Sequence, residues 1–198
     1  KLSNYHLVHE HLMRYSDIGL FIGLSILTAA VAKSAQFPYS SWLPRAMEGP
    51  TPSSAIFYGS LSVHFGVFIL LRTFPFWEQQ FMVRIIIGLT GLITAIISFF
   101  ITRVQFTIKT QIAYASITQI GLMFIEVALG WHAIALIHFA GNAFLRTYQL
   151  LVSPSVVSYL IRDQFYHFVP VSKIGNNGIK NKFRYTIYTL SLKEWYMD

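Results

Sequence analysis

Apolar residues dominate this chain in five long runs, which short polar or charged stretches separate. The runs cover residues 18–32, 52–71, 83–101, 112–129 and 133–152. A helix needs about 20 mostly apolar residues to cross the hydrocarbon core of a bilayer, and the last four runs reach or approach that length. The pattern therefore predicts membrane-spanning helices over these four runs.

The first run is short and spans a membrane only if it continues past Lys33 towards Trp42. Pro38 and Pro44 stand in that continuation, and a proline inside a helix removes a backbone hydrogen bond. Irregular backbone at membrane depth is tolerated only where it is buried in protein or faces water. We therefore expect a broken transmembrane helix within an all-α, polytopic membrane helix bundle of about five spans.

The composition also indicates a membrane protein. Charged residues make up 12% and hydrophobic residues 54% of the 198 residues, whereas a soluble domain has roughly 25% charged residues. Cysteine is absent, which excludes disulfides and thiolate metal sites. The net charge is +7, but the basic residues are scattered among apolar runs, so we expect a lipid bilayer and no nucleic acid as partner.

The distribution of charge divides the chain into three regions. Basic residues are frequent after Pro154, and short basic segments next to spans favour the cytoplasmic side. We expect an extramembrane N-terminal segment at 1–17, a transmembrane domain at 18–153 and a basic cytoplasmic tail with an amphipathic helix at 154–198. The first residue is lysine rather than methionine, so we expect a piece of a longer chain.

Two charged residues flank the expected break. A charge in a span costs roughly 2.5 to 3.5 kcal/mol on insertion scales and needs a partner, water or a function. Lys33 is either a lysine that extends from a helix end to the interface or an ammonium that loads and releases a proton. Glu48 either contributes to such a site or is stabilised near the start of the next helix.

A stripe of polar residues marks the last apolar run. His138, Asn142 and Arg146 recur every four residues, with Gln149 nearby, so they share one helix face. Such a stripe lines either a helix interface or a hydrated channel, and we expect it to face the protein interior or water. A lone histidine in a span is commonly a hydrogen-bonded packing residue, but three polar groups need partners together.

Three other groups of ionisable residues have open interpretations. His64 lies within the second run, and Glu126 lies close enough to Gly130 to be interfacial. The stretch YHLVHEH, at 5–11, contains three histidines and a glutamate, but no further metal ligand is evident. Motifs of hydrolytic or phosphate-binding sites are absent from the sequence.

Three stretches resemble the antiporter-like, proton-conducting subunits of respiratory complex I and of Mrp-type cation antiporters. They are AKSAQFPYSSWLPRAMEGPTPSSA from Ala32, QIAYASITQIGLMF from Gln111 and LIHFAGNAFLRTYQLL from Leu136. The resemblance covers about residues 18–152 and implies a fragment of the antiporter-like fold. It implies that Lys33 is a central proton carrier and that His138 continues the polar axis.

The chain departs from that family where Asn142 replaces a usual histidine and Arg146 a usual lysine. Tyr58 also replaces a usual histidine, while His64 is new. Arginine is a poor proton carrier because it stays charged. The stretches that carry these variants, with the terminal YTLSLKEWYMD, are similar to DabB, the antiporter-like subunit of two-component inorganic carbon pumps.

The likeness to DabB implies a proton-conducting subunit that energises inorganic carbon uptake in a bacterial inner membrane. Its partner would be a DabA-like, carbonic-anhydrase-like protein, which would hold the zinc; we expect no cofactor in this chain. The alternative is an Mrp-type antiporter or a subunit among the complex I membrane-arm subunits, including a mitochondrial one. A structural subunit without conduction is a third possibility. The residues expected on the proton path are Lys33, Glu48, His64, Glu126, His138, Asn142 and Arg146.

Overall fold

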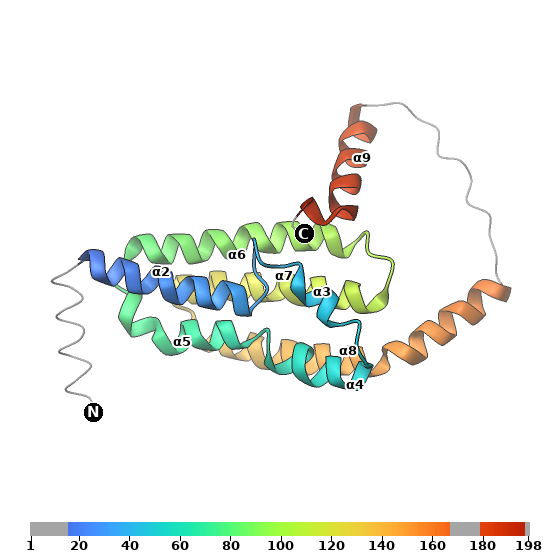
Figure 1. The fold of residues 1–198 in the computed structure, drawn as a ribbon, viewed down its shortest axis with the longest axis horizontal. Helices are drawn as coiled ribbons and strands as arrows, with labels where there is room; N and C mark the ends of the chain where they lie inside the picture. Colours follow the sequence, from blue (N-terminus) through green and yellow to red (C-terminus); the bar gives the residue numbers. More distant parts are fainter. Residues whose placement is uncertain (1–15, 167–178, 197–198) are drawn as a thin grey trace.

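The computed structural model describes residues 16–166 and 179–196, in which helices and loops occur without any strand. The elements are α2 (Ser16–Lys33), α3 (Trp42–Ala46), α4 (Thr51–Ser53), the π-helix η1 (Ser54–Leu61), α5 (Phe65–Trp77), α6 (Phe81–Thr102), α7 (Ile108–Leu129), α8 (His132–Tyr166), α9 (Ile179–Leu192) and the 3-10 helix η2 (Glu194–Tyr196). The helices α2, α5, α6, α7 and the first part of α8 lie along one direction and pack together (Figure 1). The predicted all-α membrane bundle is confirmed.

Helices α6 and α7 are the two uninterrupted apolar helices of the described chain. By length and composition, these are the helices among the described residues that are suited to cross a membrane. The other three predicted spans differ for identifiable reasons. Helix α2 ends at Lys33, the second run is divided into shorter helices, and α8 carries the polar stripe.

Glycines bring α6 and α7 into close contact. A Cβ atom added to Gly91 would lie 2.5 Å from the carbonyl oxygen of Gly121, and one added to Gly121 would lie 2.6 Å from that of Gly91. Small residues at such interfaces let membrane helices approach each other closely. The Thr107 hydroxyl accepts a hydrogen bond from the Thr110 N–H at the start of α7, and Gly130, with a φ of 85°, ends it.

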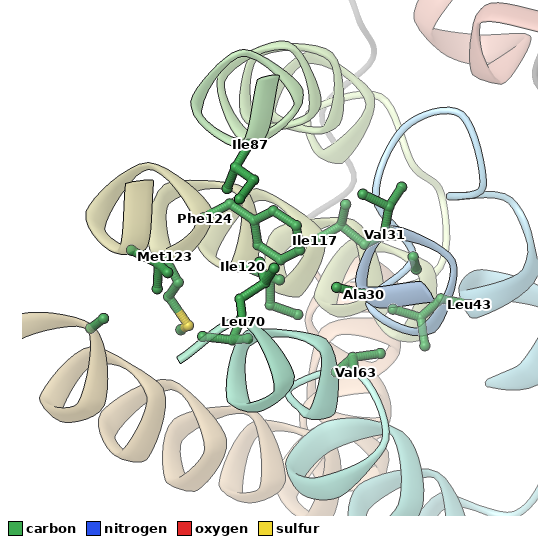
Figure 2. Packing of buried hydrophobic residues seen from close by; sticks show 14 of the residues in the cluster. Ala30, Val31, Leu43, Val63, Leu70, Ile87, Ile117, Ile120, Met123 and Phe124 are labelled. Atoms are coloured by element: carbon green, nitrogen blue, oxygen red, sulfur yellow. The ribbon is translucent and has the colours of Figure 1, made fainter. Parts of the chain in front are cut away.

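The apolar core lies where α7 meets its neighbours. Phe124 and Ile120 of α7 are fully buried, and in Figure 2 they lie between Ile87 of α6 and Leu70 of α5. Ala30 of α2 belongs to the same buried cluster. Helix α7 is thus the central element around which the other helices are arranged.

The first break follows α2, as the prolines predict. Helix α2 ends at Lys33, and the chain continues irregularly until Trp42, with Ala35 at a φ of 52°. The Phe37 N–H donates a 3.1 Å hydrogen bond to the hydroxyl of Thr94 on α6. Because Thr94 lies within the middle part of α6, the break falls at mid-depth of that span, and the predicted broken helix is confirmed.

A second break, which the sequence analysis did not predict, interrupts the run at 52–71. Residues 62–64 form a turn between η1 and α5, so the prediction of one continuous helix there is wrong. The Ser34 hydroxyl, in the first break, donates a 2.6 Å hydrogen bond to the carbonyl of Val63, in the second. The two breaks therefore face each other, and the first supplies a donor to a carbonyl of the second.

Helix α8 continues beyond the predicted span, through Pro154, to Tyr166. Its final part turns away from the direction of the bundle (Figure 1), and a proline inside a helix commonly causes such a bend. Helix α9 lies in the predicted tail and contacts α6. Most of the predicted N-terminal segment lies outside the described residues, so the division into three regions stays a prediction.

Candidate functional site

Arg146 is the centre of a buried hydrogen-bond network. Its guanidinium donates from Nε to Asn142 Oδ1 at 3.2 Å, from Nη1 to Gln149 Oε1 at 2.6 Å, and from Nη2 to the Ala115 carbonyl at 3.3 Å. Asn142 and Arg146 are only 5% and 7% exposed. The prediction that these residues of the stripe face the protein interior is confirmed.

Asn142 connects this arginine to a histidine on another segment. His64 lies in the second break, directly before α5, and is fully buried. Its Nε2 lies 2.9 Å from the amide nitrogen of Asn142. The side of the His64 ring is covered by Phe139 of α8, with the two ring centroids 5.1 Å apart.

A second hydrogen-bonded group lies one helical turn away on α8. His138 Nδ1 is 2.8 Å from Glu126 Oε1, and His138 Nε2 is 2.9 Å from Gln119 Oε1. The side chains of His138 and Glu126 are 24% and 18% exposed, so this group is less deeply buried than the arginine group. Glu126 is paired with His138 within the bundle, and both its interpretations stay open.

Lys33 lies apart from this network. It is the last residue of α2 and is exposed on the surface of the described residues. It contributes to the lining of a cavity of about 680 Å³, together with Ala29, Ala32, Trp42, Phe57, Tyr58 and Ser62. The Trp42 indole N–H donates to the Ala32 carbonyl at 3.1 Å, which fixes one wall of this cavity.

Glu48 lies in a different cavity, of about 640 Å³, between the link after α3, the start of α7 and α8. Lys109 also lines that cavity, and its ammonium donates a 2.7 Å hydrogen bond to the Gly49 carbonyl. Glu48 is exposed, and no ion pair joins it to Lys33. The structure therefore does not support a direct effect of Glu48 on that lysine.

The structure places five of the seven predicted residues in two neighbouring hydrogen-bonded groups: His64, Glu126, His138, Asn142 and Arg146. The sequence analysis missed Gln119, although it lies seven residues before Glu126 on α7 and therefore on the same helix face. The described residues contain no group of three or more histidines, cysteines or carboxylates that could hold a metal ion. The histidine stretch at 5–11 lies outside the described residues.

Comparison with known proteins gives the family of the chain. Residues 1–165 match the family described as NADH:quinone oxidoreductase/Mrp antiporter, TM. The chain is 37% identical over 166 residues to NADH-ubiquinone oxidoreductase chain 5 of Neurospora crassa, which covers 84% of this chain and 22% of the relative. It is 38% identical over 175 residues to the protein of the same name from Metridium senile, covering 88% of this chain and 28% of the relative.

A chloroplastic relative gives the same result. The chain is 37% identical over 142 residues to NAD(P)H-quinone oxidoreductase subunit 5 of Mesostigma viride, covering 72% of this chain and 22% of that protein. The chain therefore belongs to the transmembrane family of NADH:quinone oxidoreductase and Mrp antiporter subunits. It spans between about a fifth and just over a quarter of the length of these curated relatives.

Proposed function

We propose that this chain is part of a proton-translocating, antiporter-like membrane subunit of a quinone oxidoreductase complex. The observation that carries the proposal is the pair of neighbouring hydrogen-bonded groups, His138 with Glu126 and His64 with Asn142 and Arg146, within an apolar bundle. Ionisable groups inside a membrane are costly and mark ion pathways or proton relays. The names of the relatives supply the oxidoreductase part of the proposal.

Lys33 is the proposed carrier at the entrance to this pathway. Its ammonium lies at the end of a broken helix, beside a cavity large enough for water, and a lysine can release and regain a proton. From there, protons pass to the His138 and Glu126 group through hydrated space between the helices. Arg146 remains charged and positions its neighbours. The proposed partners are the other membrane-arm subunits of such a complex.

Inorganic carbon uptake is a second candidate function. Asn142 and Arg146 favour it, because they replace the usual histidine and lysine and because the same stretches are similar to DabB. In that case the partner is a DabA-like zinc protein and the location is a bacterial inner membrane. Purification of the tagged protein from its native membrane distinguishes the two, since one predicts quinone oxidoreductase subunits and the other a zinc protein.

Replacement of Lys33 tests proton conduction in either assembly. Lys33→Ala should abolish NADH-driven proton uptake into inverted membrane vesicles, or uptake of labelled inorganic carbon if the zinc partner is found. Lys33→Arg should fail as well, because arginine keeps its proton at every working pH.

Lys109→Ala is the matched control, because this lysine binds the Gly49 carbonyl in another cavity and should leave transport unchanged. Levels of the protein and of its partners in the membrane are checked by immunoblotting. Full transport by the Lys33→Ala protein would exclude Lys33 as the carrier.

A further inference from the structure

We propose that the two neighbouring hydrogen-bonded groups hold their histidines in opposite charge states. His138 is an imidazolium between Glu126 and Gln119, whereas His64 is a neutral imidazole held by Asn142, which Arg146 orients. The relevance of these charges to transport rests on the proposed function, but the charges themselves can be measured without any transport.

The neutral state of His64 follows from the direction of hydrogen bonding. An arginine side chain has donors and no acceptor, so Asn142 must direct its carbonyl oxygen at Arg146 Nε. The amide NH₂ of Asn142 then faces His64 Nε2 at 2.9 Å and donates to it. That nitrogen must present a lone pair, which places the proton of the neutral ring on Nδ1.

The charge of His138 follows from the Glu126 carboxylate beside its ring, and the Gln119 amide can present the oxygen that a charged ring requires. Glu126 Oε1 lies 2.8 Å from Nδ1 and Gln119 Oε1 lies 2.9 Å from Nε2. Both ring nitrogens can donate only in the imidazolium form. Glu126 Oε2 is buried and has no hydrogen-bond partner among the described residues, so the carboxylate depends on this histidine for its neutralisation.

Gln119 is the positioning residue of this arrangement. Its amide can present either an oxygen or an NH₂ group to His138 Nε2, and so can match a charged or a neutral ring. The amide of Asn142 has no such freedom, because Arg146 fixes its carbonyl end. His138 can therefore change its charge when the Gln119 amide turns over, whereas the Asn142 amide cannot turn over to accommodate a charged His64.

The remaining charges of this region agree with the assignment. Glu126 of α7 faces His138, and Arg146 lies two helical turns further along α8. The ionisable group supplied by the segment before α5 is His64. With His64 neutral, the region holds two cations and one carboxylate. A second imidazolium beside the Asn142 and Arg146 pair would add a third buried cation without adding an anion.

Nitrogen NMR of the membrane-embedded protein labelled with ¹⁵N-histidine measures both charge states directly. A protonated and an unprotonated imidazole nitrogen differ strongly in chemical shift, and the two rings are assigned through their backbone resonances. At pH 7 we expect two protonated nitrogens for His138, and for His64 a protonated Nδ1 with an unprotonated Nε2. A neutral His138, or a charged His64, would overturn the proposal without the need for any variant.

Asn142→Asp tests the fixed direction of hydrogen bonding. The aspartate keeps an oxygen for Arg146 but replaces the NH₂ that faces His64 with a second oxygen, so His64 should gain a proton. We expect the ratio of charged to neutral His64 to rise at least about tenfold. Gln149→Glu adds the same charge to α8 but contacts Arg146 alone, and should leave His64 unchanged. Equal effects of the two variants would contradict the proposed direction of hydrogen bonding from Asn142 to His64.

Gln119→Leu tests the positioning role at His138. The loss of one of two acceptors should lower the ratio of charged to neutral His138 about tenfold, and Gln149→Leu should not change it. An unchanged His138 in Gln119→Leu would exclude Gln119 as the positioning residue. If the charges are as proposed but Lys33→Ala still conducts protons, the charge assignment stands and the proposed pathway fails.

Discussion

The helix pair α6–α7 and the pair α2–α5 lie in the same bundle but differ in how their backbone N–H and C=O groups are hydrogen-bonded. In the first pair, both helices run without interruption over 22 residues, and glycines bring them into contact. In the second pair, both segments break, and the Ser34 hydroxyl joins one break to the other at Val63. The continuous pair forms the scaffold, while the broken pair places irregular backbone and Lys33 at mid-depth.

The same comparison explains the location of two ionisable residues, Lys33 and His64. A continuous helix uses its N–H and C=O groups internally and needs no polar neighbour within a bilayer. A break exposes such groups and needs polar side chains nearby, as the bond from Phe37 to Thr94 illustrates. His64 lies in one break and Lys33 at the edge of the other. The broken pair thus positions His64 and Lys33, whereas Glu126 lies on the continuous helix α7 and pairs with His138 of α8.

The largest expected effect concerns the glycine contact of the continuous pair. Gly91→Leu should lower the free energy of unfolding by about 3 kcal/mol, because the added side chain collides with the Gly121 backbone. Gly141→Leu is the control, since a Cβ at Gly141 has no neighbour within 4 Å. Unfolding in mixed detergent micelles measures both, and similar losses in the two variants would contradict the tight packing of α6 and α7.

A smaller effect is expected where the two breaks meet. Ser34→Ala leaves the buried Val63 carbonyl without its donor and should cost about 2 kcal/mol in the free energy of unfolding. Ser25→Ala, on the preceding helix α2, removes an exposed hydroxyl that bonds within α2 and should change the free energy of unfolding by less than about 0.5 kcal/mol. If the Ser25 variant were equally destabilised, the special role of the Ser34 bond would be refuted.

The smallest effect is expected at the contact between the first break and the scaffold. Thr94→Val removes the acceptor of the Phe37 N–H and should cost about 1 kcal/mol. Hydrogen exchange at the Phe37 amide should become about fivefold faster. Thr90→Val, whose hydroxyl bonds within α6, is the control. Unchanged exchange at Phe37 would show that Thr94 does not hold the break in place.

The sequence predicted those features that depend on local chemistry. Pro38 and Pro44 predict the first break, and the spacing of the polar stripe predicts the buried face of α8. The second break has no such signal, because VHF at residues 63–65 contains neither proline nor glycine. It depends on the Ser34 bond to Val63, which joins residues 29 positions apart in the sequence.

The candidate site was predictable in its members but not in its pairing. Ionisable residues inside apolar runs stand out because placing them in a membrane costs free energy, so His64, Glu126 and His138 were predicted. Their partners depend on how α7 faces α8, and that orientation follows from packing. Gln119 was missed because an uncharged amide in an apolar run gives a weaker signal than a charge. Glu48 was assigned to Lys33 from proximity in sequence, whereas the fold separates them into different cavities.

The three donor contacts of Arg146 also affect how charge can travel through the bundle. Relay along a hydrogen-bonded chain requires every member both to accept a proton and to pass one on, and the direction of every bond must be able to reverse. A guanidinium has no acceptor, so a hydrogen-bonded chain from His64 through Asn142 cannot pass a proton beyond Arg146. In the proposed pathway, Arg146 therefore passes on no proton, and protons move on the side of His138.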